Sequence, residues 1–216
     1  MNISKKITKI KEKGLIKLIK QLFSRYIYSH WKVYILERPL ELKSIEITTT
    51  QQPIQVTEYN LHVFEKYFKH YIPSIKKWLK DGARPDAYID DNGDVYMMHW
   101  INEGGDYYDS SYYKFTIPVP KDSIYQFAGD LSKERRATSL LIQSLQRIWD
   151  EYYAQGYKTS RTLVSESNTM SIKVHLRLGY QEIGKLIHVY RLFYFISFHK
   201  FEYYSGSKLK KSIKKS

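Results

Sequence analysis

Apolar residues recur along the chain with two different periods, which predicts an alternation of helices and strands. Between Leu15 and Tyr26 they return every three or four residues with lysines among them, the pattern of an amphipathic helix. The segment 31–38 is β-branched and aromatic and stops at Pro39, which predicts a first strand. The segment 45–56, rich in Thr, Gln and Ile, would extend that strand or pair with it.

Two helices and a hairpin are predicted next. Helical spacing runs over residues 57–73, and a second short helix is expected over 74–79. The strand-like runs 87–90 and 95–101 flank an Asp-Asn-Gly-Asp sequence, and an Asn-Gly turn between two such runs predicts a β-hairpin.

The rest of the chain is predicted to be mixed α/β. The expected elements are two strands, a long helix, a strand, a short helix and a final pair of strands, at 113–119, 123–128, 137–153, 159–165, 169–178 and within 180–198. The helix over 137–153 has the strongest pattern, because its apolar residues form one stripe and Gly156 ends it. Helices interspersed among strands favour a mixed sheet with helices on both faces.

Charge divides the chain into a neutral body and two basic ends. The 216 residues carry a net charge of +13, of which residues 1–38 contribute +8 and residues 205–216 contribute +5. We therefore expect a basic amphipathic helix over 1–30, one globular domain over 31–204 and a basic disordered tail over 205–216.

Several classes of protein are excluded or disfavoured by composition. The chain has no cysteine, which excludes disulfides, thiolate metal sites and a cysteine nucleophile. Its seven histidines are scattered with no pair four residues apart, so we expect no metal. No secretory signal pattern or membrane-spanning run of about 18 apolar residues is present, and we expect a cytoplasmic protein.

The segment 168–180 carries the most informative motif. GNAT acyltransferases end their core with N-x-x-A-x-x-x-Y-x-K-x-G-F between two strands, and here the run is Asn168-Thr-Met-Ser-Ile-Lys-Val-His175-Leu-Arg177-Leu-Gly179-Tyr180. An Asn, a small residue, a basic residue, a Gly and an aromatic residue fall in register. The chain therefore resembles the GNAT superfamily of acyl-CoA-dependent N-acyltransferases. The resemblance implies that residues 31–204 form a GNAT-like acyltransferase domain with a splayed mixed sheet.

The same resemblance implies where the acyl donor lies. The strand ending near Asp130 and the strand at 159–165 would splay apart around the pantetheine arm of acetyl-CoA or another acyl-CoA. The pyrophosphate would lie at the N-terminus of the helix that begins near Ala137.

The phosphate loop departs from the family pattern. Q/R-x-x-G-x-G/A aligns with Ser132-Lys-Glu-Arg135-Arg136-Ala137 and keeps only the final small residue, while a second alignment makes Arg135 the leading arginine. The expected cofactor-binding residues are Arg135, Arg136, Ala137, Thr138 and Asn168. The alternative is a degenerate loop that no longer binds phosphate.

Three residues are candidates for acid–base chemistry. His175 stands where the family has its tyrosine and, as an imidazolium, would protonate the departing thiolate. The alternative is a His175 that faces solvent or satisfies a carbonyl. Asp130 and Glu166 follow the two splayed strands and are candidate bases for the acceptor amine, the alternative being cap or loop carboxylates. The tyrosine pairs 107–108 and 112–113 would form an acceptor lid or pack as a loop.

The acceptor is expected to be a small-molecule or lipid-linked amine. The basic ends also fit peripheral contact with a membrane surface through the N-terminal helix and the C-terminal tail. Two alternatives to a CoA-dependent enzyme are a non-catalytic GNAT-fold scaffold and an enzyme that uses acyl carrier protein. No base-reading motif points to nucleic acid. The aromatic segment 189–198 would allow a homodimer.

Overall fold

The computed structural model of the chain describes a large part of the sequence. The described residues are 14, 17, 22–23, 26–41, 52–136, 139–193 and 195–209. Most of the predicted N-terminal helix, of the segment 45–56 and of the C-terminal tail therefore lies outside the described residues, as do Ala137 and Thr138. Within the segment 45–56, Ile54 forms an isolated antiparallel bridge with Ala87.

Seven strands form one mixed sheet in the order β2-β3-β6-β7-β1-β8-β9. Their bounds are β1 Tyr28–Pro39, β2 Arg84–Ile89, β3 Val95–Glu103, β6 Ser123–Leu131, β7 Thr159–Ser165, β8 Gln181–Leu192 and β9 Ile196–Tyr203. The β6–β7 pair is parallel and the other pairs are antiparallel. The first strand lies inside the sheet, between β7 and β8, and its run of four consecutive buried residues from Val33 suits a strand covered on both faces.

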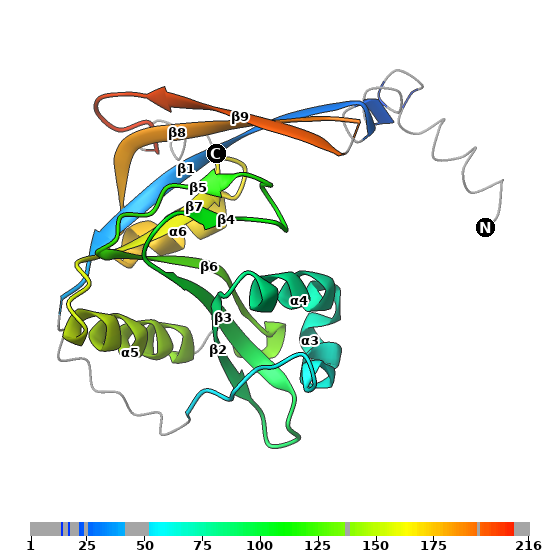
Figure 1. The fold of residues 1–216 in the computed structure, drawn as a ribbon, viewed down its shortest axis with the longest axis vertical. Helices are drawn as coiled ribbons and strands as arrows, with labels where there is room; N and C mark the ends of the chain where they lie inside the picture. The colour runs from blue at the N-terminus through cyan, green and yellow to red at the C-terminus, as the bar shows by residue number, and fades with distance from the viewer. Residues whose placement is uncertain are drawn as a thin grey trace.

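Helices cover both faces of this sheet, as predicted (Figure 1). The helical elements are η1 Leu61–Phe64, α3 Glu65–Phe68, η2 Lys69–Tyr71, α4 Ile72–Lys80, η3 Lys133–Arg135, α5 Leu140–Ala154 and α6 Thr169–Arg177. On one face Trp78 of α4 is fully buried against Trp100 of β3. On the other face Trp149 of α5 packs with Tyr180. Among the described residues, no helix has both the length and the apolar character needed to cross a bilayer.

The predicted hairpin is confirmed, but two other predicted elements differ. β2 and β3 pair across the Asn-Gly turn. The helix predicted over 57–73 is instead the series η1, α3 and η2, in which none of the three caps makes a side-chain hydrogen bond. The strand predicted over 113–119 is shortened to β5 (Thr116–Ile117), which pairs with β4 (Tyr107–Tyr108) in a separate sheet. Lys114 has φ 56°, which interrupts an extended backbone.

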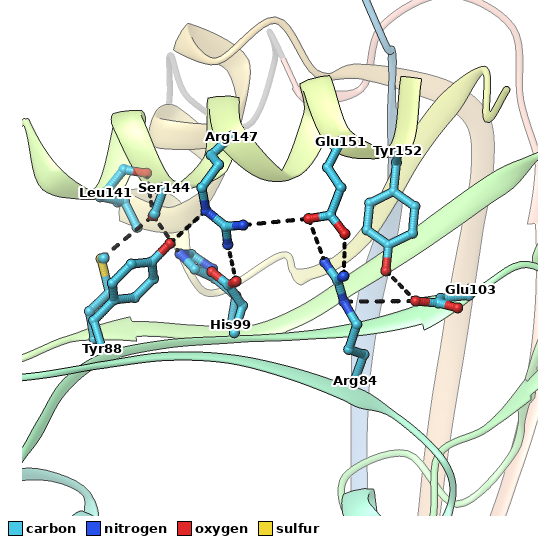
Figure 2. Close-up of polar contacts among 11 residues, drawn as sticks. Arg84, Tyr88, His99, Glu103, Leu141, Ser144, Arg147, Glu151 and Tyr152 are labelled. Atoms are coloured by element: carbon cyan, nitrogen blue, oxygen red, sulfur yellow. Dashed lines mark hydrogen bonds and ion pairs between the residues drawn. The ribbon is translucent and has the colours of Figure 1, made fainter. Parts of the chain in front are cut away.

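A network of ion pairs fixes α5 against β2 (Figure 2). Arg147 of α5 pairs with the buried carboxylate of Asp86, and its Nε donates to the Tyr88 hydroxyl at 3.0 Å. Arg84 of β2 pairs with Glu151, which also lies 3.4 Å from Arg147. Each arginine therefore contacts a carboxylate on the neighbouring element, which sets the position of α5 over the sheet.

Candidate active site

A cleft opens where β6 and β7 separate. The two strands pair only over Ser123–Tyr125 and Thr159–Arg161. Beyond that point β6 continues beside β3 to Leu131, and β7 continues beside β1 to Ser165. The cleft between the diverging strands has a volume of about 1070 Å³ and is lined by both strands and by α6. The predicted splay of these two strands is thus present.

A β-bulge in β6 shapes one wall of the cleft. The register between β3 and β6 shifts so that β6 gains one residue, and Ala128 has φ 48°. The next residue, Gly129, packs so closely on His99 that an added Cβ would lie 2.8 Å from Nδ1 of that ring. Bulges of this kind redirect the backbone beside active sites. A glycine inside a strand pattern was the signal in the sequence that could have predicted this bulge.

His99 is a buried residue of the cleft that sequence reasoning missed. Its side chain comes from β3, is 4% exposed and has Nε2 3.3 Å from the hydroxyl of Ser144 on α5 (Figure 2). Burial, followed by the charge of Arg147, lowers the pKa of His99 to about 4, while Asp130 opposes the shift. The ring is therefore neutral, and it packs against Gly129 of the bulge.

Gln126 lines the cleft and has a buried hydrogen-bond donor whose partner is not among the described residues. Its Oε1 accepts from Trp149 at 2.8 Å, from Ser160 at 2.7 Å and from the Tyr180 hydroxyl at 3.1 Å. These three donors fix the orientation of the amide. In the part of the chain that the structure describes, its buried Nε2 has no partner. A buried donor without a partner is costly, so a ligand that accepts a hydrogen bond would fit here.

The α6 wall carries two of the predicted residues. Asn168 caps α6 by accepting from the Ser171 amide at 3.1 Å, and it lines the cleft. His175 also lines the cleft, with Nδ1 2.7 Å from the Ser171 carbonyl and its ring 5.2 Å from that of Tyr180. Burial lowers the pKa of His175. The ring is thus held neutral, with Nδ1–H donating to a carbonyl and Nε2 left as an acceptor.

The β6 wall carries two further predicted residues. Asp130 lines the cleft, and its Oδ1 accepts from the Leu131 amide at 2.8 Å and from Arg136 at 3.4 Å. Arg136 lines the cleft as well and donates from Nε to the Leu131 carbonyl at 3.2 Å. The pKa of Tyr71, which also lines the cleft, is raised mainly by burial and secondly by the charge of the Asp130 carboxylate.

Two predicted residues lie away from the cleft lining. The Arg135 guanidinium lies over the Tyr96 ring, 4.1 Å from its centroid. Glu166 is 3.4 Å from the hydroxyl of Tyr34 on β1. The structure therefore brings Asp130, Arg136, Asn168 and His175 together around one cleft and leaves Arg135 and Glu166 outside its lining.

Aromatic side chains on the α4 face line another part of the cleft, which we call the aromatic mouth. They are Trp31, Tyr71, Tyr112, Tyr113, Tyr125 and Phe127. Of the two tyrosine pairs expected to form a lid, only Tyr112 and Tyr113 line the cleft, because Tyr107 is buried in the core and Tyr108 is 55% exposed outside it. Arg191 of β8 donates to the Tyr112 carbonyl at 2.8 Å and ties this loop to the sheet.

Comparisons with known proteins support the fold rather than an activity. No protein-family model matches the chain, and no curated protein matches it. Among solved structures, the chain is similar to the GCN5-related glucosamine N-acetyltransferase region of a fungal multi-domain GH3 β-N-acetylglucosaminidase. That match has 15% identity and a TM-score of 0.50, and it covers 77% of this chain and 22% of that one.

Two bacterial structures are also similar. A conserved protein of unknown function from Staphylococcus epidermidis matches with 12% identity and a TM-score of 0.51, over 82% of this chain and 66% of that one. A GNAT-family acetyltransferase from Colwellia psychrerythraea matches with 10% identity and a TM-score of 0.48, over 86% of this chain and 61% of that one. The chain thus spans 22% and 61% of the lengths of the fungal and Colwellia proteins. With its splayed mixed sheet and helices on both faces, the chain has the GNAT fold.

Proposed function

We propose that the protein is an acyl-CoA-dependent N-acyltransferase, with acetyl-CoA as the first donor to test. The observation that carries this proposal is the cleft between β6 and β7, with a bulged wall and the unpartnered donor of Gln126. From Gln126 onward, the edge of β6 that faces β7 is not paired with it. An extended amide chain such as pantetheine can pair with such an edge in the manner of an added strand.

The residues around the cleft suit the other parts of the donor. Arg136 lies between the end of β6 and the start of α5, where a guanidinium can bind phosphate oxygens. Asn168 lies on the opposite wall, at the N-terminus of α6. The Ala137 and Thr138 amides belong to the same proposed site as a prediction from the family resemblance alone.

The chemistry needs two proton movements. The amine nitrogen forms a bond to the thioester carbon while the carbon–sulfur bond breaks, so the nitrogen loses a proton and the thiolate gains one. Asp130 lines the cleft as an acceptor-only carboxylate and is our candidate base. His175 stands on the opposite wall with Nε2 unprotonated, so it would protonate the thiolate only after taking up a proton there. Backbone amides along the bulge would polarise the thioester carbonyl.

Acyl transfer can be tested with a matched pair of carboxylate variants. Thiol release from acetyl-CoA would be followed with a panel of amines that includes amino sugars, amino acids and aminolipids. Asp130→Asn should lower kcat/KM by about 10²–10⁴-fold, which is the usual contribution of a general base. Glu166→Gln is the control, because Glu166 directly follows the other splayed strand but lies outside the cleft lining.

Two results would contradict the proposal. Equal loss of activity in both variants would remove the role given to Asp130. A wild-type protein that neither binds acetyl-CoA nor releases its thiol with any amine would favour acyl carrier protein as donor or a non-catalytic scaffold.

A further inference from the structure

The far end of the three strands β1, β8 and β9 exposes a cluster of large apolar side chains. We call this cluster the aromatic tip, and it consists of Ile27, Tyr28, Phe193, Phe195, Ile196 and Phe198. Phe195 is 69% exposed and Phe193 is 54% exposed, with their rings 6.4 Å apart. In Figure 1 these strands run along one edge of the molecule and end beyond the helices. A contiguous exposed apolar patch of this kind marks a contact surface.

The backbone at the tip indicates that the aromatic residues are not there for folding. Phe193 begins the turn between β8 and β9 and has φ 47°, in the left-handed region. Glycine or asparagine adopts that conformation at lower cost than a phenylalanine. The turn therefore contains a phenylalanine with a strained backbone and a half-exposed ring, and burial in the core does not explain its presence.

The charge of the surrounding strands identifies the kind of partner. Along the described strands, residues 28–36 contain one Lys and residues 183–201 contain three Lys or Arg, and neither segment contains Asp or Glu. Two glutamates border these strands: the Glu166 amide donates to the Lys32 carbonyl at 2.9 Å, and Glu202 contacts His188. Exposed aromatic rings beside cationic side chains are complementary to the interface of an anionic lipid bilayer.

We propose that the aromatic tip docks the protein on an anionic membrane surface. Phe193, Phe195 and Ile196 would enter the interfacial layer, while Lys32 of β1 and Lys200 of β9 would lie near the lipid headgroups. This surface belongs to the folded sheet, and it acts in addition to any contact made by the basic ends of the chain.

The aromatic tip lies close to the cleft, so docking would bring the cleft near the membrane and its lipids. This step rests on the proposed function, in which the cleft binds the acceptor amine. Trp31 lines the aromatic mouth of the cleft and lies three residues from Tyr28, about 10 Å along the strand. Arg191 lines the same mouth and lies two residues from Phe193. A docked protein would therefore hold this mouth close to the membrane, within reach of an amine carried by a lipid.

The test is co-sedimentation of the full chain with vesicles of phosphatidylcholine alone or of phosphatidylcholine and phosphatidylglycerol. The wild type should sediment with the anionic vesicles and less so in high salt. Phe195→Ser and Phe193→Gly should each weaken vesicle binding by about tenfold, the loss expected when one buried ring is removed. Tyr59→Ser is the matched control, since it removes a 96% exposed ring on a different part of the surface and should leave binding unchanged.

Several outcomes would overturn the proposal. They are wild type that does not bind anionic vesicles, binding that survives both tip substitutions, and an equal loss with Tyr59→Ser. Light scattering on the same samples tests whether the tip instead binds a second copy of this chain. If the protein is a dimer that tip substitutions convert to monomer, and it does not bind vesicles, the tip serves self-association. Vesicle binding is measured without acyl-CoA, so it can fail or succeed independently of the acyltransferase activity.

Discussion

The two ends of the sheet differ in whether their charged side chains form buried ion pairs. At the β2 end, Arg84 and Arg147 pair with carboxylates on a neighbouring element, and Asp86 is buried in the contact. At the far end of β1, β8 and β9, large apolar side chains are exposed, and the strand residues 28–36 and 183–201 include no acidic residue. The first end is therefore organised for stability, whereas the second presents a surface that folding alone does not require.

The cleft lies between these two ends, and its lining includes residues from both. His99 and the bulge belong to the β3–β6 side, which the ion pairs hold against α5. Trp31 and Arg191 belong to the β1–β8 side, next to the aromatic tip. Substitutions at the two ends should therefore separate effects on stability from effects on surface binding.

The largest expected effect on stability is at the paired end. Arg147→Ala would leave the Asp86 carboxylate buried without its cation, and removing one partner of a buried pair costs about 3–5 kcal/mol of unfolding free energy. Lys158→Ala, at the exposed Lys158–Asp122 pair, should cost less than about 1 kcal/mol. Chemical denaturation of both variants measures the difference. Equal costs would show that the network on α5 does not stabilise this end.

A smaller effect is expected from pH, through His99. The unfolded chain binds a proton at this histidine near its ordinary pKa of 6.5, whereas the folded protein does so only at about 4. Stability from this group is therefore complete above pH 6.5 and is lost as the pH falls toward 4, by about 3 kcal/mol in all. Denaturation from pH 7.5 to 4.5 should show this fall, and His99→Gln should make it shallower. An unchanged slope in the variant would contradict a buried, neutral His99.

The smallest effect on stability is expected at the aromatic tip. Phe193→Gly removes an exposed ring and relieves the left-handed backbone, so the unfolding free energy should stay within about 1 kcal/mol of wild type or rise. The same denaturation assay measures this variant. A loss above about 2 kcal/mol would mean that Phe193 packs as part of the core, and the contrast between the two ends would fail.

Much of the fold could be predicted from local sequence patterns. The strand Thr159–Ser165 and the hairpin at the Asn-Gly turn follow from periodicity and turn chemistry, which act over a few residues. The place of β1 inside the sheet, between two strands more than 120 residues later in the sequence, depends on long-range pairing that no local pattern encodes.

The site was predicted in part, for the same physical reason. The motif in segment 168–180 indicated Asn168 and His175, and both line the cleft. His99 and Gln126 carry no local signal, because their roles arise from burial between β3, β6 and α5. Burial also changes the protonation expected for His175, since it lowers the pKa that the sequence alone leaves at its ordinary value.

A donor site in the cleft between β6 and β7 can be tested by calorimetric titration of acetyl-CoA into the wild type, Arg136→Glu and Arg135→Glu. The two arginines are adjacent in sequence, but Arg136 lines the cleft and Arg135 lies over Tyr96. We expect the wild type to bind. Affinity should fall at least about tenfold in Arg136→Glu, where a carboxylate replaces a phosphate-binding cation, and much less in Arg135→Glu. Absence of binding by the wild type, or equal losses in the two variants, would contradict a donor site in the cleft between β6 and β7.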